Sequence, residues 1–131
     1  MRSRRRSATL MSESAMECVF CKIARGELPA RFVYEDDHVV AFDDISPQAP
    51  VHTLVIPRDH YEHLGDGVPP AVSAALCSAI PRVAEAKGVA ASGYRLIVNT
   101  GLDGGQTVPH LHVHIIGGVK MSHGMVALHS E

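Results

Sequence analysis

The stretch His110-Leu-His112-Val-His114-Ile-Ile116 alternates histidine with aliphatic side chains. In a β-strand, successive side chains point to opposite faces of the sheet. A strand over 110–116 would place the three imidazoles on one face and the aliphatic side chains on the other, against a core. Imidazoles titrate near neutral pH and suit nucleophilic, acid–base or metal chemistry, whereas alternation alone indicates only a strand. A plain polar strand face, a metal site and a catalytic site are therefore the three interpretations.

Shorter patterns predict the other elements of the fold. Runs of β-branched and aromatic residues predict strands over 31–35, 39–42, 52–56 and 94–99. Residues 18–25 predict one or two helical turns before a glycine and a proline. With the histidine strand and one long helix, these segments give an α+β domain: a five-stranded antiparallel sheet, one long helix and a short N-terminal helix.

The long helix is predicted over 69–87 from apolar residues at spacings of three and four. Proline in its first turn and Gly88 after its end suit the two helix termini. Pro81 lies inside the pattern and predicts a kink or an early stop. Cys77 is expected to pack in the core beside Leu76.

Composition indicates one globular domain. The chain has 131 residues, of which 46% are apolar and 20% are charged. Four arginines crowd the first six residues, whereas the remainder holds more acidic than basic side chains, which disfavours general nucleic-acid binding. We expect a disordered tail or alternative start over 1–16, a domain over 17–120 and a C-terminal tail over 121–131.

Localisation follows from what the chain lacks and from its cysteines. No apolar run is long enough to span a membrane, and the arginine-rich start has no apolar segment of the secretory type. The composition of the first sixteen residues fits an organelle transit peptide less well than a tail. Three cysteines, an odd number, favour a reducing compartment over a disulfide framework. We predict a cytoplasmic protein without an organic cofactor.

A glycine-rich turn precedes the histidine strand. Gly104 and Gly105 allow backbone N–H groups to converge on one point, an arrangement that binds anions. Gln106 and Thr107 add side-chain donors. Beside three histidines, this turn suggests a bound phosphate that a neutral imidazole attacks at phosphorus while a second imidazole protonates the leaving group. The turn has no lysine of the kind that P-loop enzymes carry, which disfavours a kinase.

These segments resemble one known family. The histidine row is similar to the motif of the histidine triad, or HIT, family, and further blocks resemble its Hint-like branch over about residues 17–120. The blocks are Cys18-Val-Phe-Cys21-Lys-Ile, Phe42-Asp-Asp44-Ile-Ser-Pro-Gln-Ala-Pro50, His52-Thr-Leu-Val-Ile-Pro57-Arg-Asp-His60, and Val98-Asn99-Thr-Gly101 with Asp103-Gly-Gly-Gln-Thr107.

The resemblance implies a homodimeric hydrolase or transferase of the purine nucleoside phosphoramidase type. Such an enzyme cleaves adenylyl amines to AMP through a covalent nucleotidyl-histidine. The resemblance implies His112 as nucleophile, His114 as phosphate contact and proton donor, and His52 as a supporting histidine. For the nucleotide, the resemblance implies an apolar base pocket formed by Phe20, Phe42 and Ile45. It implies Asp44 as the carboxylate that binds the ribose hydroxyls. The residues that it implies at the phosphate are Asn99, Gly105 and Thr107.

The Cys18-x-x-Cys21 pair can be redox-active, metal-binding or inert. The βαβ context of a thioredoxin-like site is absent from the predicted order of elements. In zinc-bearing relatives the other two ligands lie at the positions of His60 and His110, so the resemblance implies a structural zinc on Cys18, Cys21, His60 and His110. An empty site is the alternative.

Other functions stay open at this stage. They are a diadenosine polyphosphate hydrolase or a transferase with inorganic phosphate as acceptor, a zinc-containing nucleotide-binding adaptor without essential catalysis, and a metalloenzyme with zinc on the triad. Relatives commonly end in a Trp-Pro-Pro-Gly-like segment, whereas this chain contains no tryptophan. The leaving group is therefore not specified by the resemblance.

Overall fold

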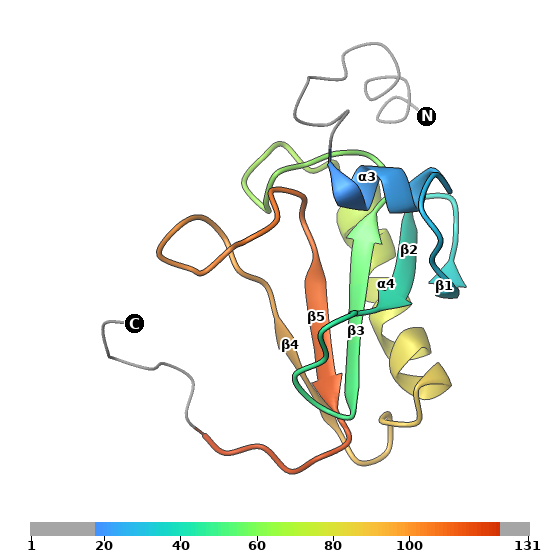
Figure 1. Ribbon diagram of the computed structural model, residues 1–131, viewed down its shortest axis with the longest axis vertical. Coiled ribbons are helices and arrows are strands. Elements are labelled where there is room, and N and C mark those ends of the chain that lie inside the picture. Colours follow the sequence, from blue (N-terminus) through green and yellow to red (C-terminus); the bar gives the residue numbers. More distant parts are fainter. Residues whose placement is uncertain (1–17, 124–131) are drawn as a thin grey trace.

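The computed structural model describes residues 18–123, so the tail expected over 1–16 and most of the tail over 121–131 lie outside the described residues. Within this range one antiparallel sheet has the strand order β1-β2-β3-β5-β4 (Figure 1). The strands are β1 (Phe32–Glu35), β2 (Val39–Asp43), β3 (Val51–Pro57), β4 (Tyr94–Ile97) and β5 (Val113–Gly117).

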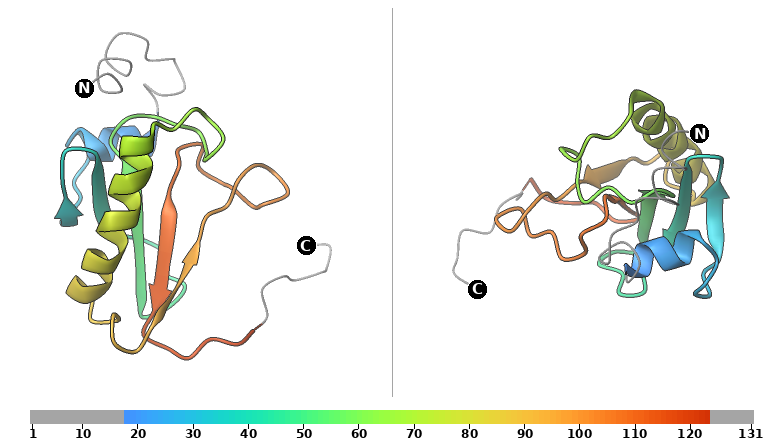
Figure 2. Two further views of the ribbon diagram at one scale, coloured as in Figure 1. Left: turned by 180° about the vertical axis from the view of Figure 1, so that it is seen from behind. Right: turned by 90° about the horizontal axis from the view of Figure 1, so that it is seen from above.

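Two helices cover opposite faces of this sheet. The long helix α4 (Pro70–Ala86) crosses one face, and the short helix α3 (Val19–Ala24) lies on the other face at one end (Figures 1 and 2). The predicted α+β class, with five antiparallel strands, one long helix and one short helix, is confirmed. No helix among the described residues is both long and apolar enough to cross a membrane.

Helix α4 confirms the predicted apolar stripe and corrects two details. Val72, Leu76 and Val83 are buried against the sheet. The helix continues past Pro81 to Ala86, so an early stop at the proline is wrong. Burial of the stripe on both sides of the proline outweighs the backbone hydrogen bond that a proline cannot donate. Cys77 is exposed, because it lies about 100° around the helix from Leu76 and outside the stripe.

Alternation along the strands divides the core into two layers. In β3, Val55 packs toward α4, while Leu54 and Ile56 pack toward α3. The same alternation runs through β5, where Val113 and Ile115 join the α4 layer. The opposite face of β5 carries His114 and Ile116.

The histidine row keeps its alternation but is only partly a strand. Strand β5 begins at Val113, so His110 and His112 precede it, and the prediction of a strand from residue 110 is wrong. Pairing between β3 and β5 runs from Val51↔Gly117 to Val55↔Val113 and stops before Pro57. Proline has no N–H to donate, and its carbonyl oxygen accepts from Nε2 of the His110 ring instead, at 2.9 Å.

Candidate active site and metal centre

The histidine row supplies two clusters on the sheet face that α3 partly covers. His112 and His114 lie beside His52 of β3, and their rings are adjacent, with centroids 4.9 Å apart for His112 and His114 and 5.1 Å apart for His52 and His114. His110 turns instead toward Cys18 and Cys21, with its Nδ1 atom 3.4 and 3.5 Å from the two sulfurs. The three histidines therefore divide between two sites.

A backbone contact fixes the tautomer of His112. Its Nδ1 lies 2.7 Å from the carbonyl oxygen of His110, which can only accept, so Nδ1 carries the proton. The lone pair then sits on Nε2, the atom on the other side of the ring. Burial lowers the pKa of His112, which keeps this ring neutral at pH 7. His112 therefore presents a nucleophilic nitrogen.

A chain of hydrogen bonds gives His114 the complementary tautomer. The backbone N–H of Gln48 donates to Nδ1 of His52 at 3.0 Å, so the proton of His52 is on Nε2. That proton is donated to Nδ1 of His114 at 2.9 Å. The remaining proton of a neutral His114 is therefore on Nε2, and His114 presents an N–H donor where His112 presents a lone pair.

The half-buried ring of His114 resists a second proton. Burial first, and then the neighbouring rings of His112 and His52, lower the pKa of His114 to about 4. Asp44 opposes this shift, and its Oδ2 lies 3.5 Å from Nε2 of His52. Its Oδ1 accepts the backbone N–H of Ser46 at 2.8 Å. Asp44 therefore lies beside His52, and both of its carboxylate oxygens have further acceptor positions.

The apolar residues expected at a base lie beside this carboxylate. Phe20 packs edge-on against Phe42, with ring centroids 5.7 Å apart, and against His112 at 5.2 Å. Such pairs contribute about 0.5–1.5 kcal/mol each beyond the area they bury. Ile45 is 97% exposed.

The glycine-rich turn is shaped by Gln106. Its Oε1 accepts the backbone N–H of Gly101 at 2.9 Å, and its Nε2 donates to the carbonyl oxygens of Glu62 and Val108 at 2.6 and 3.0 Å. The side chain thus holds the turn and ties it to the segment that contains Glu62. Gly105 has φ +79°, which a side chain would strain.

Asn99 and Thr107 are the remaining residues expected at a phosphate. Asn99 lines a cavity together with His52 and His114. Thr107 is exposed at the end of the turn, before the histidine row. The structure thus brings His52, His114 and Asn99 to one cavity.

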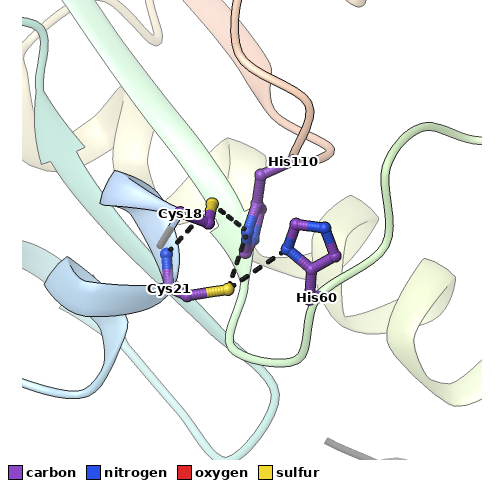
Figure 3. A group of neighbouring side chains, drawn as sticks. All are labelled: Cys18, Cys21, His60 and His110. Carbon is purple, nitrogen blue, oxygen red and sulfur yellow. Dashed lines mark hydrogen bonds between the residues drawn. The ribbon is translucent and has the colours of Figure 1, made fainter. Parts of the chain in front are cut away.

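The second cluster joins segments far apart in the chain (Figure 3). Cys18 is the N-cap residue of α3, Cys21 lies in its first turn, His60 follows β3, and His110 precedes β5. Nδ1 of His60 lies 3.2 Å from Sγ of Cys21, and all four ligand atoms lie within 4.8 Å of one another. The side-chain hydrogen bond with Cys21 lowers the pKa of the Cys18 thiol and thereby favours a thiolate.

These distances fit a tetrahedral metal. Ligand atoms about 2.0–2.3 Å from a central zinc are roughly 3.5 Å from one another, close to the sulfur–nitrogen separations found here. His110 also has the required tautomer, because Nε2 donates to Pro57 and leaves the Nδ1 lone pair facing both sulfurs.

Asp44, His52 and His114 form a second group of potential ligands. The hydrogen bond between the two imidazoles already occupies the Nδ1 lone pair of His114 and the Nε2 position of His52. A metal bound by Asp44, His52 and His114 would have to break the hydrogen bond between the two imidazoles. The Cys/His cluster is therefore the better metal site.

Sequence reasoning missed two contributors to the site. The backbone N–H of Gln48 sets the tautomer of His52, and a pattern of side chains does not predict a hydrogen bond from the backbone. Arg95 of β4 lines the cavity beside His114. Its position was available from the alternation of β4, since it faces the same side of the sheet as the histidines once β4 is paired with β5.

The amino-acid sequence matches one protein family and several of its members. The profile of the HIT domain matches residues 25–121. The chain is 45% identical over 115 residues to the purine nucleoside phosphoramidase of Escherichia coli (strain K12), covering 79% of this chain and 89% of the relative. It is 45% identical over 103 residues to the protein HitA of Neisseria gonorrhoeae, covering 76% and 94%.

Solved structures agree with these sequence matches. A histidine triad protein from Clostridium difficile superposes with a TM-score of 0.78 at 46% identity, covering 84% of this chain and 97% of the other. A HIT family hydrolase from Legionella pneumophila Philadelphia 1 gives 0.77 at 42% identity, covering 82% and 97%.

Proposed function

Because the chain belongs to the HIT domain family and is a hydrolase of that type, we propose that it cleaves purine nucleoside phosphoramidates to AMP through a covalent nucleotidyl-histidine. The relative named purine nucleoside phosphoramidase supports the substrate class. The observation that carries the mechanism is the opposite tautomers of the neighbouring rings of His112 and His114.

In the first step, Nε2 of His112 attacks phosphorus and displaces the amine. The Nδ1–H bond to the His110 carbonyl oxygen holds the ring in place and disperses the positive charge that develops on it. An amine leaves readily only when its nitrogen gains a proton. Nε2 of His114 supplies that proton from the imidazolium form of the ring, which the bound anionic phosphoramidate favours, and the water that later hydrolyses the phosphorus–His112 bond returns it.

The nucleotide occupies the surface between the two aromatic residues and the glycine-rich turn. Phe20, Phe42 and the exposed Ile45 hold the purine, and Asp44 accepts hydrogen bonds from the two ribose hydroxyls. Asn99, Gly105 and Thr107 contact the phosphate. The 97% exposure of Ile45 supports this assignment, because a bound base would bury it.

A rapid-quench experiment tests the covalent step. The protein is mixed with an adenosine 5′-phosphoramidate, stopped in denaturant within one turnover, and its mass is measured before and after proteolysis. We expect a gain of one adenylyl group on the peptide that holds His112. AMP release without such an adduct would contradict the covalent step, and no AMP release would contradict the proposed activity.

We propose that zinc occupies the cluster of Cys18, Cys21, His60 and His110 in a structural role. Zinc there ties the start of α3 to the segments before β5 and after β3. It does not take part in the reaction, because the two reacting rings lie outside the cluster.

We also propose a homodimer that forms along β4. This strand lies at the edge of the sheet, and Leu96, Ile97 and Val98 are 46%, 37% and 36% exposed. Light scattering of the wild type and of Ile97→Asp tests this, with a monomeric variant expected.

A cytoplasmic location is supported by three cysteines that form no disulfide.

A further inference from the structure

The short segment His60-Tyr61-Glu62, called the 60–62 segment below, contacts both the metal cluster and the glycine-rich turn. At its start, Nδ1 of His60 lies 3.2 Å from Sγ of Cys21. Two residues later, the carbonyl oxygen of Glu62 accepts a hydrogen bond from Nε2 of Gln106 at 2.6 Å. The metal cluster and the turn are therefore joined through three consecutive residues.

The 60–62 segment is held firmly between these two contacts. Tyr61 is fully buried, and its carbonyl oxygen accepts the backbone N–H of Leu111 at 2.6 Å. The backbone N–H of Glu62 donates to Oδ2 of Asp66 at 2.9 Å. Because the segment is short and tied down in its middle, a change in the position of His60 is passed on to the carbonyl oxygen of Glu62.

The amide of Gln106 connects this segment to both ends of the turn. Its Oε1 accepts the backbone N–H of Gly101 at 2.9 Å, where the turn begins. Its Nε2 donates to the carbonyl oxygen of Val108 at 3.0 Å, where the turn ends, as well as to that of Glu62. One side chain thus sets the shape of the turn and its position relative to the 60–62 segment.

The turn depends on these hydrogen bonds because little else packs against it. Residues 101–105 are all exposed. Gln106 lies in the chain between Gly105 and Thr107, which are assigned above to the phosphate. Backbone N–H groups bind an anion only when they converge on it, so the phosphate contacts depend on the conformation of the turn.

We propose that Gln106 couples the metal cluster to the phosphate site, so that zinc and the phosphate of the nucleotide each strengthen the binding of the other. This rests on the proposed function and on the proposed zinc, and it gives Gln106 a positioning role. Zinc fixes His60, the 60–62 segment fixes the carbonyl oxygen of Glu62, and Gln106 then holds the turn for the phosphate. Such coupling is reciprocal by thermodynamic necessity.

AMP and adenosine test the coupling, because they differ only in the phosphate. The zinc affinity of the full chain is measured by competition with a coloured chelator, once in saturating AMP and once in saturating adenosine. We expect zinc to bind about tenfold more tightly with AMP than with adenosine, within the usual range for coupled sites. Gln106→Met, which has a similar length and no amide, should reduce this factor to about twofold or less.

Two further variants isolate the hydrogen bond to Glu62. Gln106→Glu keeps an acceptor for Gly101 and loses the donor, so it should lose the coupling as Gln106→Met does. Glu62→Gln is the matched control, because it changes an exposed side chain and keeps the carbonyl oxygen that Gln106 uses. It should retain the wild-type factor. If Gln106 only stabilised the fold, its variants would lower the melting temperature and leave the factor unchanged.

The outcomes separate this coupling from the proposals beneath it. Equal zinc affinity with AMP and adenosine in the wild type, or an unchanged factor in either Gln106 variant, overturns the coupling and leaves the proposed function intact. A wild type that binds zinc but not AMP contradicts the proposed function, and one that binds AMP but not zinc contradicts the proposed metal site. Either result overturns the coupling as well. Should Gln106→Met not fold, Gln106→Glu decides.

Discussion

The two ends of the histidine row differ in what surrounds the imidazoles. His110 is fully buried, and its ring faces two sulfurs and a carbonyl oxygen. His114 is half-buried and faces a cavity and another imidazole. Residues four apart in one alternating run thus have different chemistry, because the elements opposite them differ: α3 and the end of β3 for one, the middle of β3 and β4 for the other.

The difference teaches that partners, more than residue type, set the tautomer of a histidine. Pro57 accepts from Nε2 of His110 and frees Nδ1, whereas His110 accepts from Nδ1 of His112 and frees Nε2. The carbonyl oxygen of Pro57 thus leaves His110 with a lone pair that can bind a metal, and the carbonyl oxygen of His110 leaves His112 with a lone pair that can attack phosphorus. The main chain of His110 also joins the two sites, since it anchors the nucleophile while its ring faces the thiols.

Replacing the nucleophile His112 should produce the largest effect, because it should abolish activity without affecting the cluster around His110. His112→Asn keeps a side-chain N–H for the His110 carbonyl oxygen and removes the attacking nitrogen. We expect kcat for AMP release to fall by roughly 10⁴-fold, as for loss of a covalent nucleophile. Zinc content and melting temperature should stay near those of the wild type. A variant that retains a tenth of the activity would show that His112 is not the nucleophile.

Removing a metal ligand should have the reverse effect. Cys21→Ser should lose zinc, measured by plasma mass spectrometry, and lower the stability by about 2–3 kcal/mol, or about 10 °C in melting temperature. AMP release should fall by only about tenfold, through displacement of Phe20 and of the His110 carbonyl oxygen.

Cys77→Ser is the matched control for this change, because Cys77 is exposed on α4 and outside the cluster. It should leave zinc content, melting temperature and activity unchanged. Zinc retained by Cys21→Ser, or a wild type purified without zinc that does not gain stability when zinc is added, would contradict the proposed metal site.

The sequence predicted the faces of the histidine row better than its boundaries. Leu111, Val113 and Ile115 enter the core as the alternation required. The start of β5 was missed because alternation does not reveal whether a partner strand is present, and here pairing stops before Pro57. Likewise, β4 ends at Ile97, two residues earlier than predicted, since its pairing with β5 ends at His114.

The site was predictable as a list of residues more than as a geometry. The four metal-ligand positions came from a family resemblance, and spacing along the chain could not show that their ligand atoms converge. Gln106 was expected to offer donors to a phosphate, whereas its amide N–H groups donate to the carbonyl oxygens of Glu62 and Val108. The tautomers depend on backbone atoms of Gln48 and His110, which no side-chain motif encodes.

Removing the hydrogen bond from His52 that sets the tautomer of His114 should have a moderate effect on kcat. His52→Leu removes the donor to Nδ1 of His114, so we expect kcat to fall by about 10- to 100-fold, with a smaller change in KM. His52→Gln keeps an N–H in a similar place and should retain more activity than the leucine variant. Equal losses in both variants would indicate that His52 acts through packing alone.

The smallest effect should appear in the pH dependence of stability. The pKa of His114 is lowered from 6.5 to about 4, so between these values the unfolded chain binds a proton that the folded chain does not. Stability from this group is therefore complete above pH 6.5 and is lost as the pH falls toward 4. Denaturant unfolding at several pH values should show a shallower decline for His114→Gln than for its parent.

This comparison is best made with Cys21→Ser as the parent, so that release of zinc in acid does not add to the decline. An NMR titration of the His114 ring in the same protein should give a midpoint near 4. A midpoint near 6.5 would mean that water and ions reach the ring more freely than its half-buried position and two neighbouring imidazoles imply. Burial and the neighbouring rings of His112 and His52 would then not be what holds down the pKa of His114.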